Sequence, residues 1–370
     1  MKYYIIAGEV SGDLHASFLI KELKAQDPSA EFRVWGGDMM RTEGATIVRH
    51  INDLAFMGFV EVIANLKTIL GNLSFCKKDI INYNPDCVIF VDYPGFNLKI
   101  AKFCHKKNIK NFYYISPKVW AWKKGRIKTM KKVLDKLFVI FPFEKKFFEK
   151  YNFNVEYVGN PILDEILDFT QTQKKEDFLS KNSLDSKPII ALLPGSRVQE
   201  IKTTLPIQMS LVEKYPDFEF VVAGLNNHSE AFYRKYMNCD KTKIIFNQTY
   251  SILNVAYSAV VCSGTATLET ALFNVPEVVC YKANPISFSI GKLLVDLNYI
   301  SLVNIILDKL AVVELLQNDW TTEKLDIEFK KITFDRDYRN IMLMEYTNLK
   351  SMLGNAGASR TTASKIIELI

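Results

Sequence analysis

The sequence is missing several patterns that mark common protein classes. Its six cysteines form no CxxC pair and mostly lie in apolar runs. This usage is typical of reduced core residues and argues against a disulfide framework or a zinc site. The first glycine turn, from Gly8 to Gly12, does not have the GxGxxG spacing, so a dinucleotide site is not indicated.

Long uninterrupted hydrophobic runs are also missing. The first apolar segment turns at Gly8, which makes it too short for the hydrophobic region of a signal peptide. The most apolar long stretch, residues 286–307, is interrupted by Lys292, Asp296, Asn298 and Asn304. No segment therefore qualifies as a transmembrane helix, and we expect a cytoplasmic protein.

Length and composition favour an ordinary globular protein of more than one domain. The chain has 370 residues, which exceeds the usual size of one domain. Hydrophobic residues make up 48% and charged residues 24% of the sequence, both usual values for a soluble protein. The formal net charge of +6 weakly favours anionic partners.

Short apolar runs alternate with helical patterns in both halves of the chain, which predicts an α/β fold with a parallel sheet in each half. The expected strands are residues 3–7, 31–35, 86–92, 111–115, 136–141, 155–158, 188–193, 219–223, 243–246, 259–262 and 278–281. We expect a first domain over residues 1–170, a polar linker over 171–187 and a second domain over 188–335. Helices over 336–370 would follow, free to pack back on the first domain.

A strand over 259–262 is followed by Ser263-Gly264-Thr265 and then by helix formers. A helix that starts after such a turn presents unpaired N–H groups and the positive end of its dipole, which together attract phosphate. With Thr265 as N-cap, Glu269 lies one turn further on the same face, where it can accept hydrogen bonds from ribose hydroxyls. The alternative is a capped helix whose Glu269 faces water.

A second turn of this kind, Pro194-Gly195-Ser196-Arg197, follows the strand over 188–193. An arginine at this point is well placed for a bidentate contact with phosphate. Two phosphate-binding turns on one sheet favour a nucleotide site in the second domain.

The strand over 86–92 ends in Asp92, and the carboxyl ends of parallel strands line the ligand crevice. Asp92 is therefore a candidate catalytic acid or base. The alternative is that it caps the helix after Pro94. His15, in the first turn of the helix after Gly12, is either a catalytic base or a partly exposed helix residue.

Two segments suit a lipid surface. Residues 59–73 carry a broad apolar stripe that includes Val62, Leu66 and Ile69; it is either core or a surface for membrane or lipid. Residues 118–132 contain seven basic residues and no acid. Three of these basic residues follow Trp120 and Trp122 closely, namely Lys123, Lys124 and Arg126. Basic residues beside tryptophans suit a surface of anionic headgroups. A solvated helix face remains the alternative, while no RNA- or DNA-binding module accompanies the segment.

A DxD triplet, Asp335-Arg336-Asp337, could hold a metal for a sugar nucleotide, but its position favours the start of a helix. We expect no metal and no cofactor.

Five segments occur in the same order as the motifs of a known family. They are Ala7-Gly8-Glu9-Val10-Ser11-Gly12-Asp13-Leu14-His15, Ser116-Pro117-Lys118-Val119-Trp120-Ala121-Trp122, Leu193-Pro194-Gly195-Ser196-Arg197, residues 263–269 and Ser301-Leu302-Val303-Asn304. The chain resembles the lipid A disaccharide synthases over nearly its whole length. The resemblance implies a metal-independent, inverting glycosyltransferase of GT-B fold, with two Rossmann-like domains facing across a cleft.

The resemblance also implies a reaction and roles for residues. The family joins UDP-2,3-diacylglucosamine to 2,3-diacylglucosamine 1-phosphate and releases UDP. Asp92 matches the essential acid of its Asp-x-Pro-x-Phe-Asn motif, whereas Gly95 stands where a second acid is common. Arg197, Glu269 and Asn304 match positions that the family uses around the UDP donor, and Lys282 stands where a basic residue is usual. The two turns are also expected to bind the donor, through Gly195, Ser196, Ser263, Gly264 and Thr265.

We therefore expect Asp92 to face the donor across the cleft and to take the proton of the acceptor hydroxyl, with Glu9 and His15 assisting. We expect the protein to act at the anionic surface of the inner membrane, on its cytoplasmic face. We expect it to bind no nucleic acid, and a homodimer is one possible oligomeric state. The rival interpretations are another GT-B UDP-hexosamine transferase or epimerase, and a non-catalytic peripheral lipid-binding protein.

Overall fold

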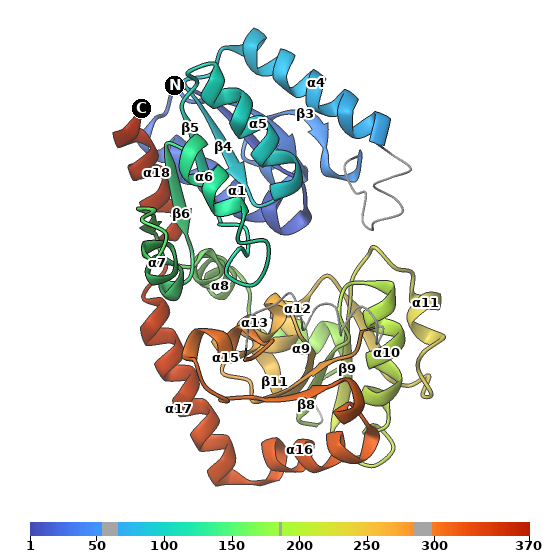
Figure 1. Ribbon diagram of the computed structural model, residues 1–370. Helices are drawn as coiled ribbons and strands as arrows, with labels where there is room; N and C mark the ends of the chain where they lie inside the picture. Colours follow the sequence, from blue (N-terminus) through green and yellow to red (C-terminus); the bar gives the residue numbers. More distant parts are fainter. Residues whose placement is uncertain (54–65, 185–186, 284–297) are drawn as a thin grey trace. The chain divides into compact units, whose positions relative to one another are not determined.

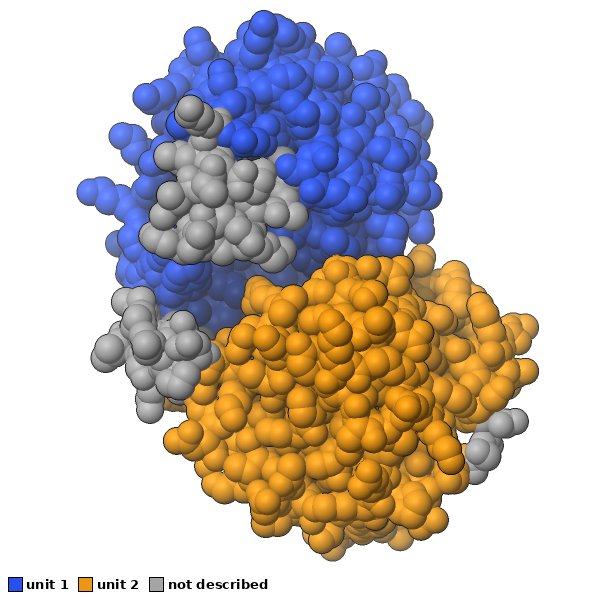
Figure 2. Space-filling model, turned by 90° about the vertical axis from the view of Figure 1, so that its right-hand side faces the viewer, with its two compact units in different colours: residues 1–164, 355–370 blue, residues 165–354 orange. Residues whose placement is uncertain are grey.

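The computed structural model describes residues 1–53, 66–184, 187–283 and 298–370 (Figure 1). The chain forms two compact units, one of residues 1–164 with 355–370 and one of residues 165–354 (Figure 2). Both are α/β, as the alternating pattern predicts. The segment 171–187, expected as a linker, contains the end of one helix and the whole of another, α9 (Lys175–Asn182).

The first unit is built on a parallel sheet of seven strands in the order β3-β2-β1-β4-β5-β6-β7. The strands are β1 (Lys2–Ala7), β2 (Glu31–Gly36), β3 (Thr46–His50), β4 (Cys87–Val91), β5 (Asn111–Tyr114), β6 (Lys136–Val139) and β7 (Glu156–Tyr157). The helices are α1 (Val10–Gln26), α2 (Asp38–Thr42), α4 (Leu66–Tyr83), α5 (Pro94–Lys106), α6 (Arg126–Val133), α7 (Pro142–Glu149) and α18 (Ala358–Leu369), with the short 3-10 helix η1 (Ile51–Asp53). Helix α8 (Pro161–Thr172) begins in the first unit and continues from Glu165 in the second.

The second unit contains a parallel sheet of six strands in the order β10-β9-β8-β11-β12-β13. The strands are β8 (Ile189–Leu193), β9 (Glu219–Gly224), β10 (Lys243–Phe246), β11 (Ala256–Cys262), β12 (Glu277–Tyr281) and β13 (Val313–Leu316). Besides α9, the helices are α10 (Val198–Met209), α11 (Glu230–Arg234), α12 (Thr249–Val255), α13 (Thr265–Leu272), α15 (Leu302–Leu307), α16 (Thr322–Phe334) and α17 (Arg336–Leu353), with the 3-10 helix η2 (Gln317–Asp319).

Each sheet has one point at which the strand order reverses. In the first unit it lies between β1 and β4, where Ala7 pairs with Val91. In the second unit it lies between β8 and β11, where Leu193 pairs with Val261. Ligands of doubly wound sheets bind outside the carboxyl ends of the strands at such a reversal. Both reversals are therefore where a site is expected.

Alternate residues of each strand face opposite sides of the sheet and pack under helices. In the first unit Tyr4, Ile6 and Phe90 belong to one buried cluster with side chains of α4, α5 and α6. In the second unit Ala191, Val221 and further strand residues form another cluster beneath α9 and α12. Buried apolar packing on both sheets holds in place the carboxyl ends of the strands, where the candidate site residues lie.

The last helix, α18, belongs to the first unit. The carboxylate of Asp164 on α8 accepts hydrogen bonds from backbone N–H groups at the start of α18, those of Gly357, Ala358 (3.2 Å) and Ser359 (2.9 Å). An acid in this position satisfies the free donors of the helix and complements its dipole. Further along α18, Ser364 donates to Gln26 of α1 at 2.9 Å.

The second unit buries one of its carboxylic acids completely. Glu277, at the start of β12, is fully buried and accepts a hydrogen bond from the Tyr346 hydroxyl at 3.4 Å, while its Oε2 has no partner among the described residues. Burial raises the pKa of Glu277 well above its usual value. The protonated form therefore stabilises the fold, and this contribution is lost as the pH rises toward the raised pKa.

We expect Glu277→Gln to unfold at a higher temperature than the wild type at pH 8, and the gap to shrink toward pH 5. Each unit of pKa difference corresponds to about 1.4 kcal/mol, or roughly 2–4 °C for a domain of this size. Thermal unfolding measured at both pH values checks this. The control is Glu213→Gln at an exposed position of the same unit, and equal pH dependence of both variants and the wild type would contradict the prediction.

Candidate active site

In the first unit the turn after β1 and the turn after β4 lie side by side, because the two strands are paired up to Ala7 and Val91. Helix α1 begins after Glu9, and Asp92 directly follows β4. The two turns also pack tightly: a Cβ atom on Gly8 would lie 2.3 Å from the Tyr93 ring. Only glycine fits at position 8, and its small size brings the Glu9 turn against the Asp92 turn.

The backbone at Asp92 is strained and firmly held. Asp92 and Tyr93 both have left-handed conformations, with φ of 44° and 48°, which cost energy in residues other than glycine. The Asp92 carbonyl accepts hydrogen bonds from the Asn97 amide at 2.7 Å and from the Tyr113 hydroxyl. Such strain is typical of residues whose side chains are aimed for function.

The N-cap of α5 is Tyr93 and not Asp92, and no side chain caps that helix. The alternative in which Asp92 serves as N-cap is therefore wrong. The physical reason is the pair of left-handed residues, which shifts the start of the helix by one position and leaves the Asp92 carboxylate outside the cap.

Burial raises the pKa of Asp92 above its usual value, and the nearby Glu9 carboxylate raises it further. Lys118 and His15 act in the opposite direction, as does a backbone hydrogen bond from Tyr93. Glu9, His15 and Lys118 thus all act on the Asp92 carboxyl at one sheet edge. Lys118 lies in one of the motifs described above, but no sequence pattern indicated that it would lie near Asp92.

The loop that carries Lys118 is fixed by a buried acid. The Trp120 indole N–H donates to Glu144 at 3.1 Å, and Glu144 also accepts from the backbone N–H groups of Ile140 and Phe141. Burial raises the pKa of Glu144 to about 7. Trp120 is only 6% exposed, so its expected place on a lipid-facing surface is wrong.

Trp122, by contrast, is 44% exposed. The Lys123 ammonium lies 4.2 Å from the centre of its ring and the Arg126 guanidinium 5.9 Å from it. Lys124 is also exposed. Arg126 is half-buried. An aromatic ring beside two exposed lysines remains suited to anionic headgroups.

The apolar stripe predicted over residues 59–73 is only partly described. Val62 lies outside the described residues, and Leu66 is described as the first residue of α4 without its side chain. Ile69 packs against the core of the first unit, whereas Leu70 is 55% exposed. Ile69 is therefore a core residue, and the helix continues past the predicted end to Tyr83.

In the second unit the turn after β8 is organised by an acid of α10. The backbone N–H groups of Ser196 and Arg197 both donate to Glu200, at 3.0 and 3.1 Å. The Arg197 guanidinium contacts the same carboxylate at 3.1 Å while its side chain is 71% exposed. Gly195 has a φ of 101°, and a Cβ atom there would lie 2.7 Å from Glu200. In this turn the Glu200 carboxylate therefore occupies the backbone N–H groups that were expected to bind a phosphate.

The neighbouring turn, after β11, is open. Helix α13 begins at Thr265 with Gly264 as its N-cap and no capping side chain, so the expected capping by Thr265 is wrong. Gly264 and Thr265 are exposed. The Ser263 hydroxyl donates to the carbonyl of Ile300 at 3.1 Å, which fixes the turn. A helix terminus of this kind can receive a phosphate.

Asn304 is fully buried, and both ends of its amide are used within the protein. It donates to the Val312 carbonyl at 2.8 Å and to Glu314 at 2.9 Å, and it accepts from the N–H groups of Ala311 and Val312. The expectation that Asn304 contacts the donor is therefore wrong, because its role is to hold the turn after α15. Lys282, directly after β12, is exposed.

The DxD triplet is a helix start. The Asp335 side chain caps α17 by accepting from the N–H groups of Asp337 (3.1 Å) and Tyr338 (3.0 Å). Within the described part of the chain no group of three or more His, Cys, Asp or Glu side chains could hold a metal ion. Over the same residues no helix combines the length and hydropathy needed to cross a bilayer.

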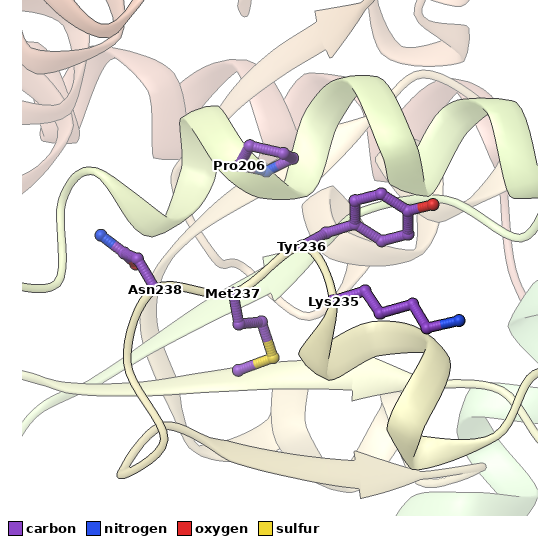
Figure 3. A pocket seen from close by; sticks show the side chains of 5 residues that line it. All are labelled: Pro206, Lys235, Tyr236, Met237 and Asn238. Atoms are coloured by element: carbon purple, nitrogen blue, oxygen red, sulfur yellow. The ribbon is translucent and has the colours of Figure 1, made fainter.

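A shallow pocket lies between α10 and the segment that follows α11 (Figure 3). Pro206, Lys235, Tyr236, Met237 and Asn238 line it. None of the residues expected at the site is among them, so this pocket is separate from the two turns at the strand reversal.

Comparison with solved structures defines the fold class. The chain resembles UDP-GlcNAc 2-epimerase from Neisseria meningitidis bound to UDP-GlcNAc, with a TM-score of 0.71, 14% identity and full coverage of both chains. It also resembles the glycotransferase of kitacinnamycin, with a TM-score of 0.65, 12% identity and coverage of 100% and 98%. The chain therefore has the GT-B type of fold, with two Rossmann-like units.

Sequence comparison gives the family. The model of the lipid-A-disaccharide synthetases matches residues 3–366. The lipid-A-disaccharide synthase of Coxiella burnetii is 35% identical over 371 residues, covering 99% of this chain and 98% of that protein. That of Geobacter sulfurreducens is 32% identical over 373 residues, covering 99% and 96%. The chain belongs to the lipid-A-disaccharide synthetase family and is a glycosyltransferase of lipid A disaccharide synthesis.

Proposed function

We propose that the enzyme transfers the diacylglucosamine unit of UDP-2,3-diacylglucosamine to the 6-hydroxyl of 2,3-diacylglucosamine 1-phosphate. The family membership supports this reaction. The observation that carries the catalytic assignment is Asp92, a carboxylate at a strand reversal that caps no helix, on a backbone held in a strained conformation.

Asp92 acts as the general base in this proposal. Its carboxylate takes the proton of the acceptor hydroxyl while the hydroxyl oxygen bonds to the anomeric carbon and the bond to UDP breaks. A single displacement of this kind inverts the anomeric centre. Lys118 and His15 counteract the effect of burial on the Asp92 pKa, which helps to keep the base ionised near neutral pH. Glu9 positions the acceptor.

The second unit binds UDP. We assign the diphosphate to the open start of α13 and to Arg197, whose exposed guanidinium turns from Glu200 to the phosphate. These positive groups stabilise the charge that develops on the departing UDP. Glu269, one turn into α13, accepts hydrogen bonds from the ribose hydroxyls.

The test is an assay with both acylated sugars, analysed by mass spectrometry. The expected product is the disaccharide 1-phosphate, formed together with one UDP for each molecule. Conversion of UDP-sugars without an acylated acceptor would favour an epimerase or another transferase. UDP binding without any turnover would contradict the catalytic assignment.

We further propose that the enzyme works at an anionic membrane surface, because both substrates carry acyl chains. The cluster of the exposed Trp122, Lys123 and Lys124 with the half-buried Arg126 supports this. It provides cations for headgroups and an aromatic ring for the interface.

We expect Lys123→Ala combined with Lys124→Ala to weaken binding to vesicles of anionic phospholipid by roughly 10–30-fold at low salt. Each cation near such a surface contributes on the order of 1 kcal/mol, and salt screens the effect. Vesicle co-sedimentation at two ionic strengths measures this. The matched control is Lys174→Ala with Lys175→Ala, two exposed lysines of the second unit; an equal loss in both double variants would sink the assignment.

A further inference from the structure

The loops that follow β8 and β9 in the second unit are tied together by two side chains. The strands are parallel neighbours, with Leu192 paired with Val222, so these loops begin side by side. Asn227, in the loop after β9, donates its amide N–H to the Ser196 carbonyl at 3.1 Å, and Nε2 of His228 lies 3.0 Å from the same oxygen. A carbonyl oxygen can only accept, so Nε2 carries a proton and donates it. One backbone oxygen therefore receives two side-chain hydrogen bonds.

These contacts act on the peptide unit that joins Ser196 to Arg197. Asn227 and His228 hold its carbonyl oxygen. Its N–H group points to the opposite side, as in any trans peptide, and donates to Glu200 at 3.1 Å. Rotating this peptide plane would break all three hydrogen bonds. The direction in which the backbone presents the Arg197 side chain is therefore fixed before any ligand binds.

The loop that supplies the two donors is itself held in place. The Leu225 N–H donates to the hydroxyl of the fully buried Tyr233 at 3.0 Å. The His228 N–H donates to the Leu225 carbonyl at 3.1 Å, which closes a turn. The His228 ring also packs against Phe232, with 4.8 Å between the ring centres. Both donors therefore stand on a loop that is anchored to the body of the second unit.

The Arg197 side chain, in contrast to its backbone, can exchange partners. It is 71% exposed, and its guanidinium contacts Glu200 at 3.1 Å. To bind a diphosphate the guanidinium must leave Glu200 and reach the phosphate. A backbone that is already fixed reduces the conformational freedom lost in this step, so more of the phosphate contact appears as affinity.

We propose that Asn227 and His228 are positioning residues: by holding the peptide before Arg197, they direct its guanidinium toward the diphosphate of the donor. This inference rests on the proposed function, because it takes Arg197 as a phosphate ligand. Both side chains act through Arg197 and not by contact with the ligand.

The experiment measures UDP affinity by calorimetry in a double-mutant cycle of Asn227→Leu and Arg197→Ala. Leucine has nearly the size of asparagine but cannot donate to the Ser196 carbonyl. In the wild-type background we expect Asn227→Leu to weaken UDP binding by roughly 3–10-fold, the usual effect of losing one hydrogen bond. In the Arg197→Ala background the same substitution should change the affinity by less than about twofold, because the side chain that it positions is gone.

His228 provides a second, independent pair of variants. His228→Phe keeps a ring beside Phe232 but removes the Nε2 donor, so it should weaken UDP binding as Asn227→Leu does. His228→Gln provides an N–H donor at a similar reach from the backbone and should recover most of the affinity. The matched control is Asn238→Leu, at an exposed asparagine of the separate pocket in Figure 3, which should bind UDP within about twofold of the wild type.

The outcomes separate the failure of this inference from that of the donor assignment. An equal loss from Asn227→Leu in both backgrounds, or no loss in either, overturns the positioning role, as does a His228→Gln variant no better than His228→Phe. A loss of UDP affinity in Arg197→Ala would still support the phosphate contact in those cases. Unchanged affinity in Arg197→Ala overturns the phosphate contact and this inference with it. Asn227 is exposed, and the His228 pair gives the answer should Asn227→Leu not fold.

Discussion

Replacing Asp92 with asparagine is expected to lower kcat/KM by about 10²–10⁴-fold, roughly 3–5 kcal/mol of transition-state stabilisation. The amide keeps the size of the side chain and much of its hydrogen bonding, but it cannot accept the proton of the acceptor hydroxyl. UDP affinity should stay within about twofold of the wild type, because the residues proposed to bind UDP belong to the second unit. Turnover and calorimetry on the same purified variant measure both quantities.

The backbone at this position makes asparagine the right substitution. Asp92 has a φ of 44°, and asparagine tolerates left-handed conformations about as well as aspartate, whereas alanine does not. The variant also removes a carboxylate whose pKa is raised by burial, so its melting temperature should not fall. A loss of turnover in Asp92→Asn therefore reports on chemistry and not on folding.

The pH dependence gives an independent check. Because the pKa of Asp92 is raised, first by burial and then by Glu9, the fall of kcat/KM toward acid should begin at higher pH than for an ordinary aspartate. Replacing Lys118 with methionine removes a cation that lowers this pKa, so the fall should move further up. A variant Asp92→Asn within a few-fold of wild-type turnover would exclude the general base, and His15 would become the next candidate.

The sheets could be predicted from the sequence because their central strands are buried on both faces. Continuous apolar runs then mark them, and the inner strands β8 and β9 follow the predicted ranges to within one residue. The two strands that were missed, β3 and β13, are edge strands whose residues are largely part-exposed. Edge strands need no apolar run, so Thr46–His50 and Val313–Leu316 gave no such signal.

The candidate site residues at the strand ends could be predicted from the sequence. The helix caps and the side-chain contacts around them could be predicted less well. The glycine turns before Arg197 and Thr265 follow from local chemistry. The positions of helix caps depend on one or two dihedral angles, which is why Tyr93 and Gly264 were not foreseen as caps. The buried role of Asn304 depends on contacts with a loop and a strand that follow it in the chain.

Asn227 and Ser196 are 31 positions apart in the sequence, and only the fold brings them together. Neither Asn227 nor His228 lies in a recognisable motif. Side-chain networks of this kind are set by tertiary packing, and local sequence patterns do not report them.

Arg197→Ala is expected to weaken UDP binding by roughly 10–150-fold and to lower turnover in parallel. A charge-assisted contact with phosphate contributes about 1.5–3 kcal/mol. In the free enzyme the guanidinium pairs with Glu200 at 3.1 Å while the Arg197 side chain stays 71% exposed, and a pair whose cation is solvated in this way contributes only about 0–1 kcal/mol. Little is therefore lost when the arginine exchanges Glu200 for the diphosphate, and most of the phosphate contact appears in the measured affinity.

Two further variants separate a specific contact from a general effect of charge. Lys202→Ala removes one positive charge from an exposed position of the same helix, and UDP affinity should stay within about twofold of the wild type. Arg197→Lys keeps the charge but loses the planar, two-pronged geometry of the guanidinium, so it should recover only part of the affinity. If Arg197→Ala and Lys202→Ala bind UDP equally well in calorimetry, the guanidinium does not contact the diphosphate, and the start of α13 must bind it without Arg197.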